Sequence, residues 1–268
     1  MIVSQLPGRA RAPCVGVLAV AWLAPGACEA DPLAFGGTLA ATSDYVYRGV
    51  SQSDGQGALQ ADLHAATDGG TFVGIWASSR DRNLEPGTAA ELQLYAGQRF
   101  TLGRGWSATV GGRADYFVDG AADHSDDYQE LSAALTWLDR YTFSVSAIPS
   151  APRYTTESSP YPGYPPGYSD RVYRSAAFSA DASGQWLLRQ RLLGGGLYAI
   201  AAAGYYYSTR PDREDAPGVG FLYGNAGLAL AWPRWRIDLG YFGAERRAAQ
   251  LFPYPVANRL AGTLSWQF

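Results

Sequence analysis

The sequence predicts an all-β fold, a transmembrane antiparallel up-and-down β-barrel of about 12 strands. Three observations lead to this prediction: apolar and polar residues alternate with period two, short and long connections alternate along the chain, and aromatic residues gather near strand ends. The 268 residues include 18 tyrosines, 8 tryptophans and 32 glycines, whereas charged residues are only 17%. This chain is richer in aromatic residues and glycine than an average soluble domain.

The first part of the chain has the composition of a signal peptide, which we expect over residues 1–30. Two arginines precede an apolar run over residues 14–24, and small residues lead to a cleavage position near Ala30. The apolar run is shorter than the roughly 20 residues that a membrane-spanning helix needs. A lipid anchor on Cys28 is the alternative, although the residues before it fit a lipoprotein signal poorly. Residues 31–268 would then form a single barrel domain without cysteines, which excludes disulfides and thiolate metal sites.

Alternation of side chains identifies the strands. In residues 58–66, for example, Leu59 and Leu63 alternate with Asp62 and His64. Because successive side chains of a strand point to opposite faces, such a strand is apolar on one face and polar on the other. Clear alternation occurs in residues 35–48, 58–66, 90–98, 106–117, 130–137, 141–147, 222–232, 235–241 and 259–268. Residues 71–79, 172–183 and 196–207 are also strand-like, but the alternation does not decide their faces.

The connections predict the topology. Short links are expected at residues 68–70, 101–105, 138–140 and 233–234, with a somewhat longer one at 187–195. Longer polar loops are expected at 49–57, 80–89, 118–127, 149–171, 208–220 and 243–257. Short turns at one end and long loops at the other are typical of outer-membrane barrels. An apolar outer face and a polar inner face indicate lipid outside the barrel and water inside.

Aromatic residues on the apolar face lie close to the predicted strand ends. Rings with a polar edge favour the headgroup region of a membrane, whereas a soluble sandwich buries more of its aromatics at strand centres. We therefore expect a lipid-facing aromatic girdle formed by Tyr45, Tyr47, Trp106, Tyr116, Trp137, Tyr141, Trp232, Trp235, Tyr241, Trp266 and Phe268.

Charged residues take the inward positions. A basic side chain on the lipid face costs roughly 2–4 kcal/mol near the bilayer midplane, which explains this sorting. The inward set could pair internally, for example Asp44 with Arg48 or Arg113 with Asp115, or could set the electric field that a solute meets. The predicted pore-lining residues are Asp44, Arg48, Asp62, His64, Glu91, Arg113, Asp115, Glu130, Arg236, Asp238 and Arg259.

The stretch SDYVYRGVSQSDGQGALQ, residues 43–60, resembles the N-terminal signature of the TorF family of uncharacterised proteobacterial outer-membrane proteins. The resemblance is strong over residues 35–100 and only architectural beyond them. It implies a barrel in the outer membrane of a Gram-negative bacterium with a proposed porin role, and it supplies no catalytic residues. The final LSWQF resembles the signal by which the barrel-assembly machinery recognises such proteins, with Phe268 at its end.

Together these observations predict a porin for passive diffusion of small hydrophilic solutes or ions, without a cofactor. Its surroundings would be outer-membrane lipids and lipopolysaccharide. A barrel of 12 strands lies between those filled by side chains and those with an open channel, so the lumen should be narrow or partly plugged. If the loop at 149–171 folds inward, conductance would be small or gated.

Two other functions are alternatives to this one. A closed structural or adhesive barrel that binds partners through its loops is the first alternative. A lipid-modifying enzyme is the second, and it would have to use His64 or His124. The acidic stretches 123–127 and 211–215 lack the spacing of a calcium loop. The net charge of −3 gives no basic surface for nucleic acid.

Overall fold

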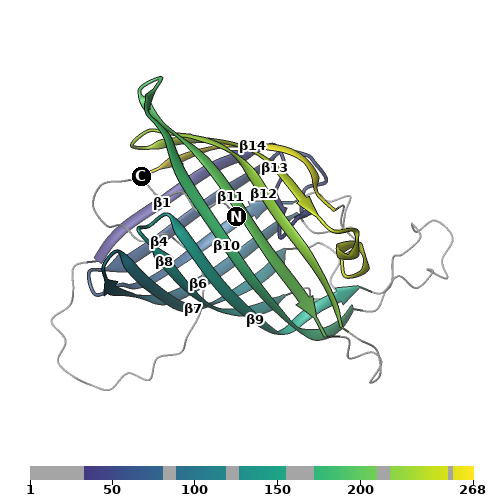
Figure 1. Ribbon diagram of the computed structural model, residues 1–268. Coiled ribbons are helices and arrows are strands. Elements are labelled where there is room, and N and C mark those ends of the chain that lie inside the picture. Colours follow the sequence, from purple (N-terminus) through teal and green to yellow (C-terminus); the bar gives the residue numbers. More distant parts are fainter. Residues whose placement is uncertain (1–32, 81–88, 119–126, 155–171, 210–217, 253–255) are drawn as a thin grey trace, which may run out of the picture.

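The computed structural model describes residues 33–80, 89–118, 127–154, 172–209, 218–252 and 256–268 (Figure 1). The predicted signal peptide lies outside these residues. Within the described residues no helix is both long and apolar enough to cross a membrane.

Twelve strands close into one antiparallel barrel, as predicted. Each strand pairs with the next along the chain, and the last pairs with the first, which is the up-and-down topology. The strands are β1 (Leu33–Thr42), β4 (Ala58–Thr67), β5 (Thr71–Ser79), β6 (Ala90–Gly103), β7 (Trp106–Val118), β8 (Tyr128–Trp137), β9 (Tyr141–Tyr154), β10 (Val172–Leu192), β11 (Gly195–Ser208), β12 (Val219–Ala231), β13 (Trp235–Ala244) and β14 (Asn258–Gln267).

Two further strands and one short helix lie outside the barrel wall. Strands β2 (Val46–Tyr47) and β3 (Val50–Ser51) pair with each other in a separate two-stranded sheet. The 3₁₀ helix η1 (Arg246–Gln250) lies between β13 and β14. These three elements come from connections at the long-loop end of the barrel.

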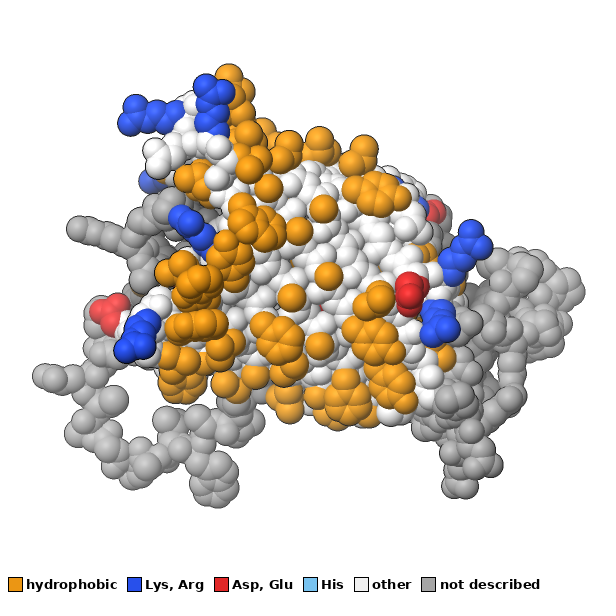
Figure 2. Space-filling view, in the orientation of Figure 1, with side chains coloured by type: hydrophobic (Ala, Val, Ile, Leu, Met, Phe, Trp, Pro, Cys, Tyr) orange, Lys and Arg blue, Asp and Glu red, His pale blue; other side chains and the backbone are white. Residues whose placement is uncertain are grey.

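The outer wall is apolar between the two ends of the barrel. Leu59 is 71% exposed, whereas Asp62 on the opposite face of the same strand is 8% exposed. Figure 2 shows hydrophobic side chains spread over the wall and charged side chains gathered toward its ends. Since exposed apolar area costs about 25 cal/mol per Å² in water, this surface fits the hydrocarbon of a membrane.

The structure also assigns the faces of the strands that the sequence left open. In β5, Phe72 and Trp76 are buried inside the barrel while Val73 is exposed outside. In β11, Tyr206 is buried inside while Tyr205 is exposed outside. Aromatic rings therefore lie on the inner face of β5 and on both faces of β11, which is why the alternation of these strands was weak.

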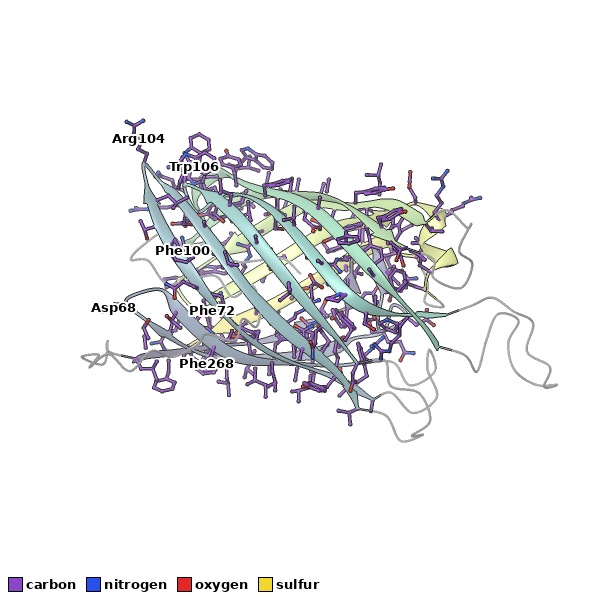
Figure 3. All side chains as sticks on the ribbon, turned by 90° about the horizontal axis from the view of Figure 1, so that it is seen from below. Asp68, Phe72, Phe100, Arg104, Trp106 and Phe268 are labelled. Carbon is purple, nitrogen blue, oxygen red and sulfur yellow. The ribbon has the colours of Figure 1, made fainter. Side chains whose placement is uncertain are left out.

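Most of the predicted girdle is confirmed. Along the short-turn end, Trp106 and Trp137 stack with ring centroids 5.9 Å apart, and Trp137 and Tyr141 stack at 5.6 Å. Tyr141 in turn meets Trp186 of β10 at 5.9 Å. Trp106 stands at this end of the barrel in Figure 3. The girdle continues through Trp235, Trp266 and Phe268 near the closure of the barrel.

Two predicted boundaries on one side of the barrel are wrong. The link expected at residues 187–195 is mostly strand, because β10 and β11 stay paired to Leu192 and Gly195 and project as a hairpin (Figure 1). Leu193 and Gly194 form its turn with φ values of 51° and 81°. Likewise β9 continues to Tyr154 through its pairing with β10, beyond the predicted start of a loop at residue 149.

The largest correction concerns the predicted strand at residues 35–48. Strand β1 ends at Thr42, and the following residues leave the wall and turn inward. Tyr45 is buried and Tyr47 is half-buried inside the barrel, so their assignment to the lipid-facing girdle is wrong. The loop predicted at 49–57 is not an external loop either, since it forms the second half of the same inward segment.

Candidate functional site

The inward segment, residues 43–57, is here named the plug hairpin. It contains β2 and β3 and enters the lumen from the long-loop end. Arg48 and Gly49 form its turn with φ values of 49° and 75°, a conformation that glycine adopts without steric cost. A side chain at position 49 would meet Ala244 Cβ at 2.6 Å and Tyr223 Cβ at 2.8 Å. The tip of the hairpin therefore lies directly against the barrel wall.

Asp44 organises the plug hairpin from within. Its Oδ1 accepts hydrogen bonds from Ser51 Oγ at 2.5 Å, Ser53 Oγ at 2.9 Å and the backbone N–H of Gly55 at 3.3 Å. Its Oδ2 lies 3.6 Å from Arg259 Nε of β14. The predicted pairing of Asp44 with Arg48 is therefore wrong: Asp44 holds the base of the hairpin, while Arg48 points away toward the opposite wall.

Arg48 connects the plug hairpin to three strands of the wall. Its Nη2 donates to Glu130 Oε1 at 2.7 Å, Ser146 Oγ at 2.9 Å and Ser179 Oγ at 3.0 Å. These partners belong to β8, β9 and β10. The guanidinium also lies over the Tyr206 ring, 5.3 Å from its centroid. Charge-assisted bonds of this kind are among the stronger side-chain contacts, so Arg48 makes the main contact between the hairpin and the wall. These contacts of Arg48 are here named the latch.

Tyr47 adds a second contact beside the first. Its hydroxyl donates to Glu130 Oε2 at 3.2 Å and accepts from Arg113 Nη2 at 2.5 Å. Burial raises the pKa of Tyr47, so the phenol stays protonated and can act as a donor. Arg113 also donates to Glu130 Oε2 at 2.9 Å and lies 3.0 Å from Asp115, the pairing that the sequence predicted. Two arginines thus surround one glutamate, with Tyr47 between them.

The other side of the plug hairpin contacts β5 and β6. The Tyr45 hydroxyl donates to Glu91 Oε2 at 3.2 Å, and the Tyr45 ring lies 5.6 Å from that of Trp76. Arg80 Nη2 donates to Gln52 Oε1 at 2.8 Å, and its Nη1 lies 3.9 Å from Glu91. Polar contacts therefore hold the hairpin to opposite sides of the barrel.

Beyond the plug hairpin, the long-loop end of the lumen contains a hydrophobic cluster. Val50 of β3 is 1% exposed and Phe221 of β12 is 0% exposed. The segment around η1 contributes Leu251, which packs on the same cluster. The buried members are Val50, Ile148, Ala151, Ala177, Tyr206, Val219, Phe221, Ala248 and Leu251. Several inward-facing residues of the wall are thus apolar at this end, beside polar ones such as Asp115 and Ser208, whereas the alternation predicted a polar inner face.

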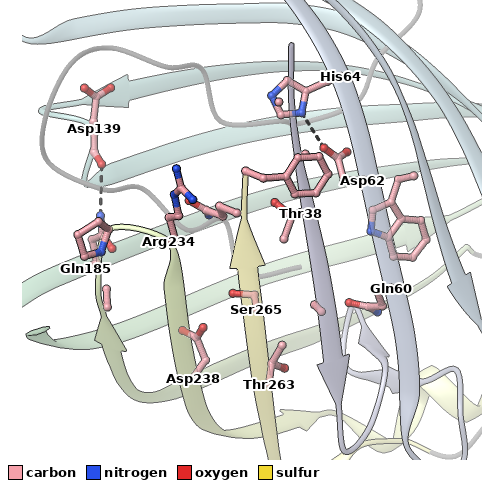
Figure 4. A pocket seen from close by; sticks show the side chains of 18 of the residues that line it. Thr38, Gln60, Asp62, His64, Asp139, Gln185, Arg234, Asp238, Thr263 and Ser265 are labelled. Atoms are coloured by element: carbon pink, nitrogen blue, oxygen red, sulfur yellow. Dashed lines mark hydrogen bonds and ion pairs between the residues drawn. The ribbon is translucent and has the colours of Figure 1, made fainter.

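The short-turn end of the lumen is hollow. A cavity of about 1810 Å³, here named the vestibule, extends from the mouth at the short turns to the plug hairpin. Its wall carries Gln60, Asp238, Thr263 and Ser265 (Figure 4), and residues 45–47 of the hairpin line its inner end. Polar side chains and an opening at one end make the vestibule a space that water and small polar solutes can enter.

The predicted pore-lining residues divide between the vestibule and the buried contacts around the plug. Those that line the vestibule are Asp44, Asp62, His64, Arg113 and Asp238. Those outside the vestibule lining are Arg48, Glu91, Asp115, Glu130, Arg236 and Arg259. Arg236 is fully engaged in a bidentate contact with Asp238, with Nη2 to Oδ1 at 2.7 Å. Whether any of these residues faces a permeating solute stays a prediction.

His64 lies on the vestibule wall. Its Nδ1 is 2.7 Å from Asp62 Oδ1 (Figure 4). Tyr95 donates to Asp62 Oδ2 at 2.5 Å. The histidine faces the lumen and not the lipid, which offers no support for a lipid-modifying site there. His124 lies outside the described residues, as does the acidic stretch 211–215. Within the described residues, no group of three or more His, Cys, Asp or Glu could hold a metal ion.

Comparison with known sequences gives little functional information. Residues 26–152, slightly less than half of the chain, match the family Gcw_chp, which is described as a bacterial protein of unknown function. No curated protein matches. The resemblance to the TorF family stays a prediction.

Comparison with solved structures identifies the fold. The NanC porin matches with a TM-score of 0.50 and 10% identity over 88% of this chain and 99% of that chain. The KdgM porin in complex with disordered oligogalacturonate matches with a TM-score of 0.45 and 7% identity, over 88% of this chain and 98% of that chain. OprD from Pseudomonas aeruginosa matches with a TM-score of 0.41 and 14% identity, over 90% of this chain and 68% of that chain. The likeness to NanC shows that the closed antiparallel barrel is of a type found in porins.

Proposed function

We propose that this protein is an outer-membrane porin through which small hydrophilic solutes or ions diffuse passively, with the plug hairpin as its constriction. The observation that carries the proposal is the combination of an apolar outer wall with a polar vestibule of about 1810 Å³. Lipid outside and water inside satisfy both faces of the same strands. The residues 31–268 would form the barrel after cleavage of the signal peptide near Ala30.

The way in which the plug is held supports a constriction that can move. Strands β2 and β3 have two residues each and pair only with each other, apart from a single bridge between Val50 and Val256. Moving the hairpin aside therefore breaks side-chain contacts and a few backbone bonds without opening the barrel wall. Rings of charged side chains around a constriction also set which ions pass.

The surroundings of the barrel belong to the same proposal. We expect outer-membrane lipids and lipopolysaccharide around the apolar wall. We also expect the barrel-assembly machinery to recognise the last strand, which ends next to Phe268. The exposed ring of Phe268 packs against Trp266 on the outer face, with centroids 5.0 Å apart, where another protein can reach it.

Single-channel recording tests the function directly. The refolded full chain is added to a planar bilayer, and we expect discrete steps of small unit conductance, because the plug hairpin narrows the lumen. Protein unfolded in denaturant and added at the same concentration is the control. If the folded protein gives only baseline current in repeated bilayers, the wild-type barrel is not a porin under these conditions.

A closed structural barrel is the second candidate, and the hydrophobic cluster at the long-loop end is the observation that favours it. Dry apolar packing around Val50 and Phe221 is more typical of a protein core than of a solute path. The two candidates differ in a variant whose plug hairpin is replaced by a flexible linker. A porin would then conduct more, whereas a structural barrel would stay closed.

A further inference from the structure

The mouth of the vestibule carries unbalanced positive charge. Arg140, Arg191 and Arg234 all line the vestibule. Arg140 and Arg234 belong to the short turns after β8 and β12, and Arg191 lies at the end of β10, next to the turn formed by Leu193 and Gly194. Figure 4 shows Arg234 among the side chains that line the cavity. Within the described residues, none of these three guanidinium groups forms an ion pair with a carboxylate.

Backbone and side-chain hydrogen bonds fix these turns beside their neighbours. The N–H of Gln185 donates to Arg140 O at 3.1 Å, which ties the turn after β8 to β10. Trp232 Nε1 donates to Leu193 O at 3.0 Å, which ties the turn after β12 to the tip of the β10–β11 hairpin. The three arginines therefore belong to one side of the mouth and not to separate parts of the surface.

The carboxylates of the vestibule are, in contrast, mostly engaged. Asp62 bonds Tyr95 and contacts His64, Asp139 pairs with Arg99 at 2.5 Å, and Asp238 is held by Arg236. Asp44 is occupied by the serines of the plug hairpin. Asp68, in the turn after β4, is the one vestibule carboxylate without such a contact in the described structure. At the mouth, three arginines without a carboxylate partner therefore face one aspartate without a cationic partner, whereas Asp44 and Asp62 keep their negative charge further inside the vestibule.

We propose that Arg140, Arg191 and Arg234 form an anion-binding site that gathers small organic anions, carrying carboxylate or phosphate groups, at the short-turn mouth of the vestibule. The planar guanidinium binds such groups through two parallel N–H donors. A cleft lined by one sign of charge also raises the local concentration of the opposite ion. This inference deepens the proposed function, because it names the class of solute that the vestibule would collect.

Equilibrium binding of citrate tests the site without any need for conduction. The full chain is refolded in a neutral sugar-headgroup detergent, which brings no phosphate, and citrate binding is measured by isothermal titration calorimetry in about 0.15 M salt, where the Debye length is about 8 Å. We expect the triple variant R140Q/R191Q/R234Q to bind citrate about tenfold more weakly, the equivalent of losing one good charge-assisted contact.

A second triple variant is the matched control. R104Q/R189Q/R247Q removes the same charge from exposed arginines outside the vestibule lining, and Figure 3 shows Arg104 at the tip of its turn, pointing away from the barrel. We expect it to keep wild-type citrate binding within about twofold, since the long-range field contributes little at such exposed positions. Equal losses in both variants, or no citrate binding by the wild type, would overturn the proposal.

A lipid headgroup offers the same phosphate chemistry, and a further measurement distinguishes it from a solute. Quenching of tryptophan fluorescence by a brominated anionic phospholipid is compared between the wild type and R140Q/R191Q/R234Q. Unchanged quenching together with lost citrate binding supports a solute site. Lost quenching without citrate binding would identify a lipid site instead and refute the proposal.

Failure of the anion-site proposal can also be distinguished from failure of the porin proposal. If the protein binds citrate through these arginines but never conducts, the anion site stands and the porin proposal fails. If the protein conducts but R140Q/R191Q/R234Q changes neither citrate binding nor the reversal potential in a salt gradient, the porin proposal stands and the anion site fails.

Discussion

The two ends of the lumen share one wall but differ in their contents. At the long-loop end, inward-facing residues such as Ile148 and Phe221 pack with the plug hairpin into a dry cluster. Toward the short-turn end, inward-facing His64 and Ser265 border a cavity. The outer face is apolar at both ends. The alternation of a barrel strand therefore determines which residues face the lipid. Segments that fold back into the lumen, here the plug hairpin and the segment around η1, determine whether the interior is open.

The two ends of the lumen should also contribute differently to stability and to transport. Buried apolar contacts at the long-loop end stabilise the fold, since cores are packed as densely as organic crystals. The vestibule contributes little packing, and its polar wall is free to serve solutes. Mutations at the two ends should therefore have effects of different kind and size.

The largest expected effect comes from removing the plug hairpin. Replacement of residues 44–56 by a Gly-Ser linker of equal length should raise single-channel conductance several-fold, because the narrowest part of the lumen becomes flexible chain. Asp54→Gly, at an exposed position of the same segment away from the Arg48–Gly49 turn, is the control and should leave conductance unchanged. An unaltered conductance in the linker variant would mean that the cluster at the long-loop end is itself the barrier.

A cavity in the filled end should be costly for stability. Phe221→Ala should lower the free energy of unfolding by about 3–5 kcal/mol, because a fully buried ring is lost and the space cannot refill. Leu228→Ala in the same strand is the matched change on the lipid face, and it should cost roughly half as much because acyl chains can fill the gap. Urea unfolding of the refolded protein in vesicles measures both. Equal losses would contradict a dry core inside the barrel.

Loss of the Arg48 latch should lower the free energy of unfolding more than loss of the Arg99–Asp139 ion pair at the short-turn end. Arg48→Ala should lower the free energy of unfolding by about 2–3 kcal/mol, since Glu130 keeps its contact with Arg113 but loses a charged donor. Arg99→Ala breaks the pair with Asp139, whose side chain is 59% exposed, and should cost less than about 1 kcal/mol. The same urea titration compares them, and the reverse order would show that the hairpin is only loosely held.

The smallest effect is expected for a polar side chain of the vestibule wall. Gln60→Ala should change the free energy of unfolding by no more than about 0.5 kcal/mol, because the removed amide faces the cavity and makes one long contact of 3.4 Å to Ser78. A loss similar to that of Phe221→Ala would mean that the hollow end is packed more tightly than the cavity indicates.

The strands could be predicted from the sequence because lipid imposes a strict sorting of side chains. All twelve were expected, and the outward faces of the clearly alternating ones were correct except at Tyr45 and Tyr47, which lie beyond the end of β1. The plug hairpin could not be recognised in this way. Asp44, Tyr45, Tyr47 and Arg48 keep the alternation of the preceding strand, so they look like its continuation.

What turns these residues inward is a set of contacts with distant parts of the chain. Arg48 and its partner Glu130 are 82 positions apart, and neither residue signals the other. The only local signals were the serines that bond Asp44 and the glycine at the hairpin turn. The inward apolar residues were missed for a similar reason: Tyr206 and Phe221 are buried only because the plug hairpin and the segment around η1 cover them.

The plug hairpin also bridges the line along which the barrel closes. Strands β1 and β14 share five residue pairs, from Thr38 with Gln267 to Thr42 with Thr263, whereas β1 and β4 share ten. The N–H of Ala257 donates to Gly49 O at 2.8 Å, and Val50 forms a bridge with Val256, so the hairpin joins the segment before β14 to the chain after β1. The element that narrows the lumen thus also adds contacts across the strand pair with the fewest paired residues, and once it moves aside the closure of the cylinder rests on β1 and β14 alone.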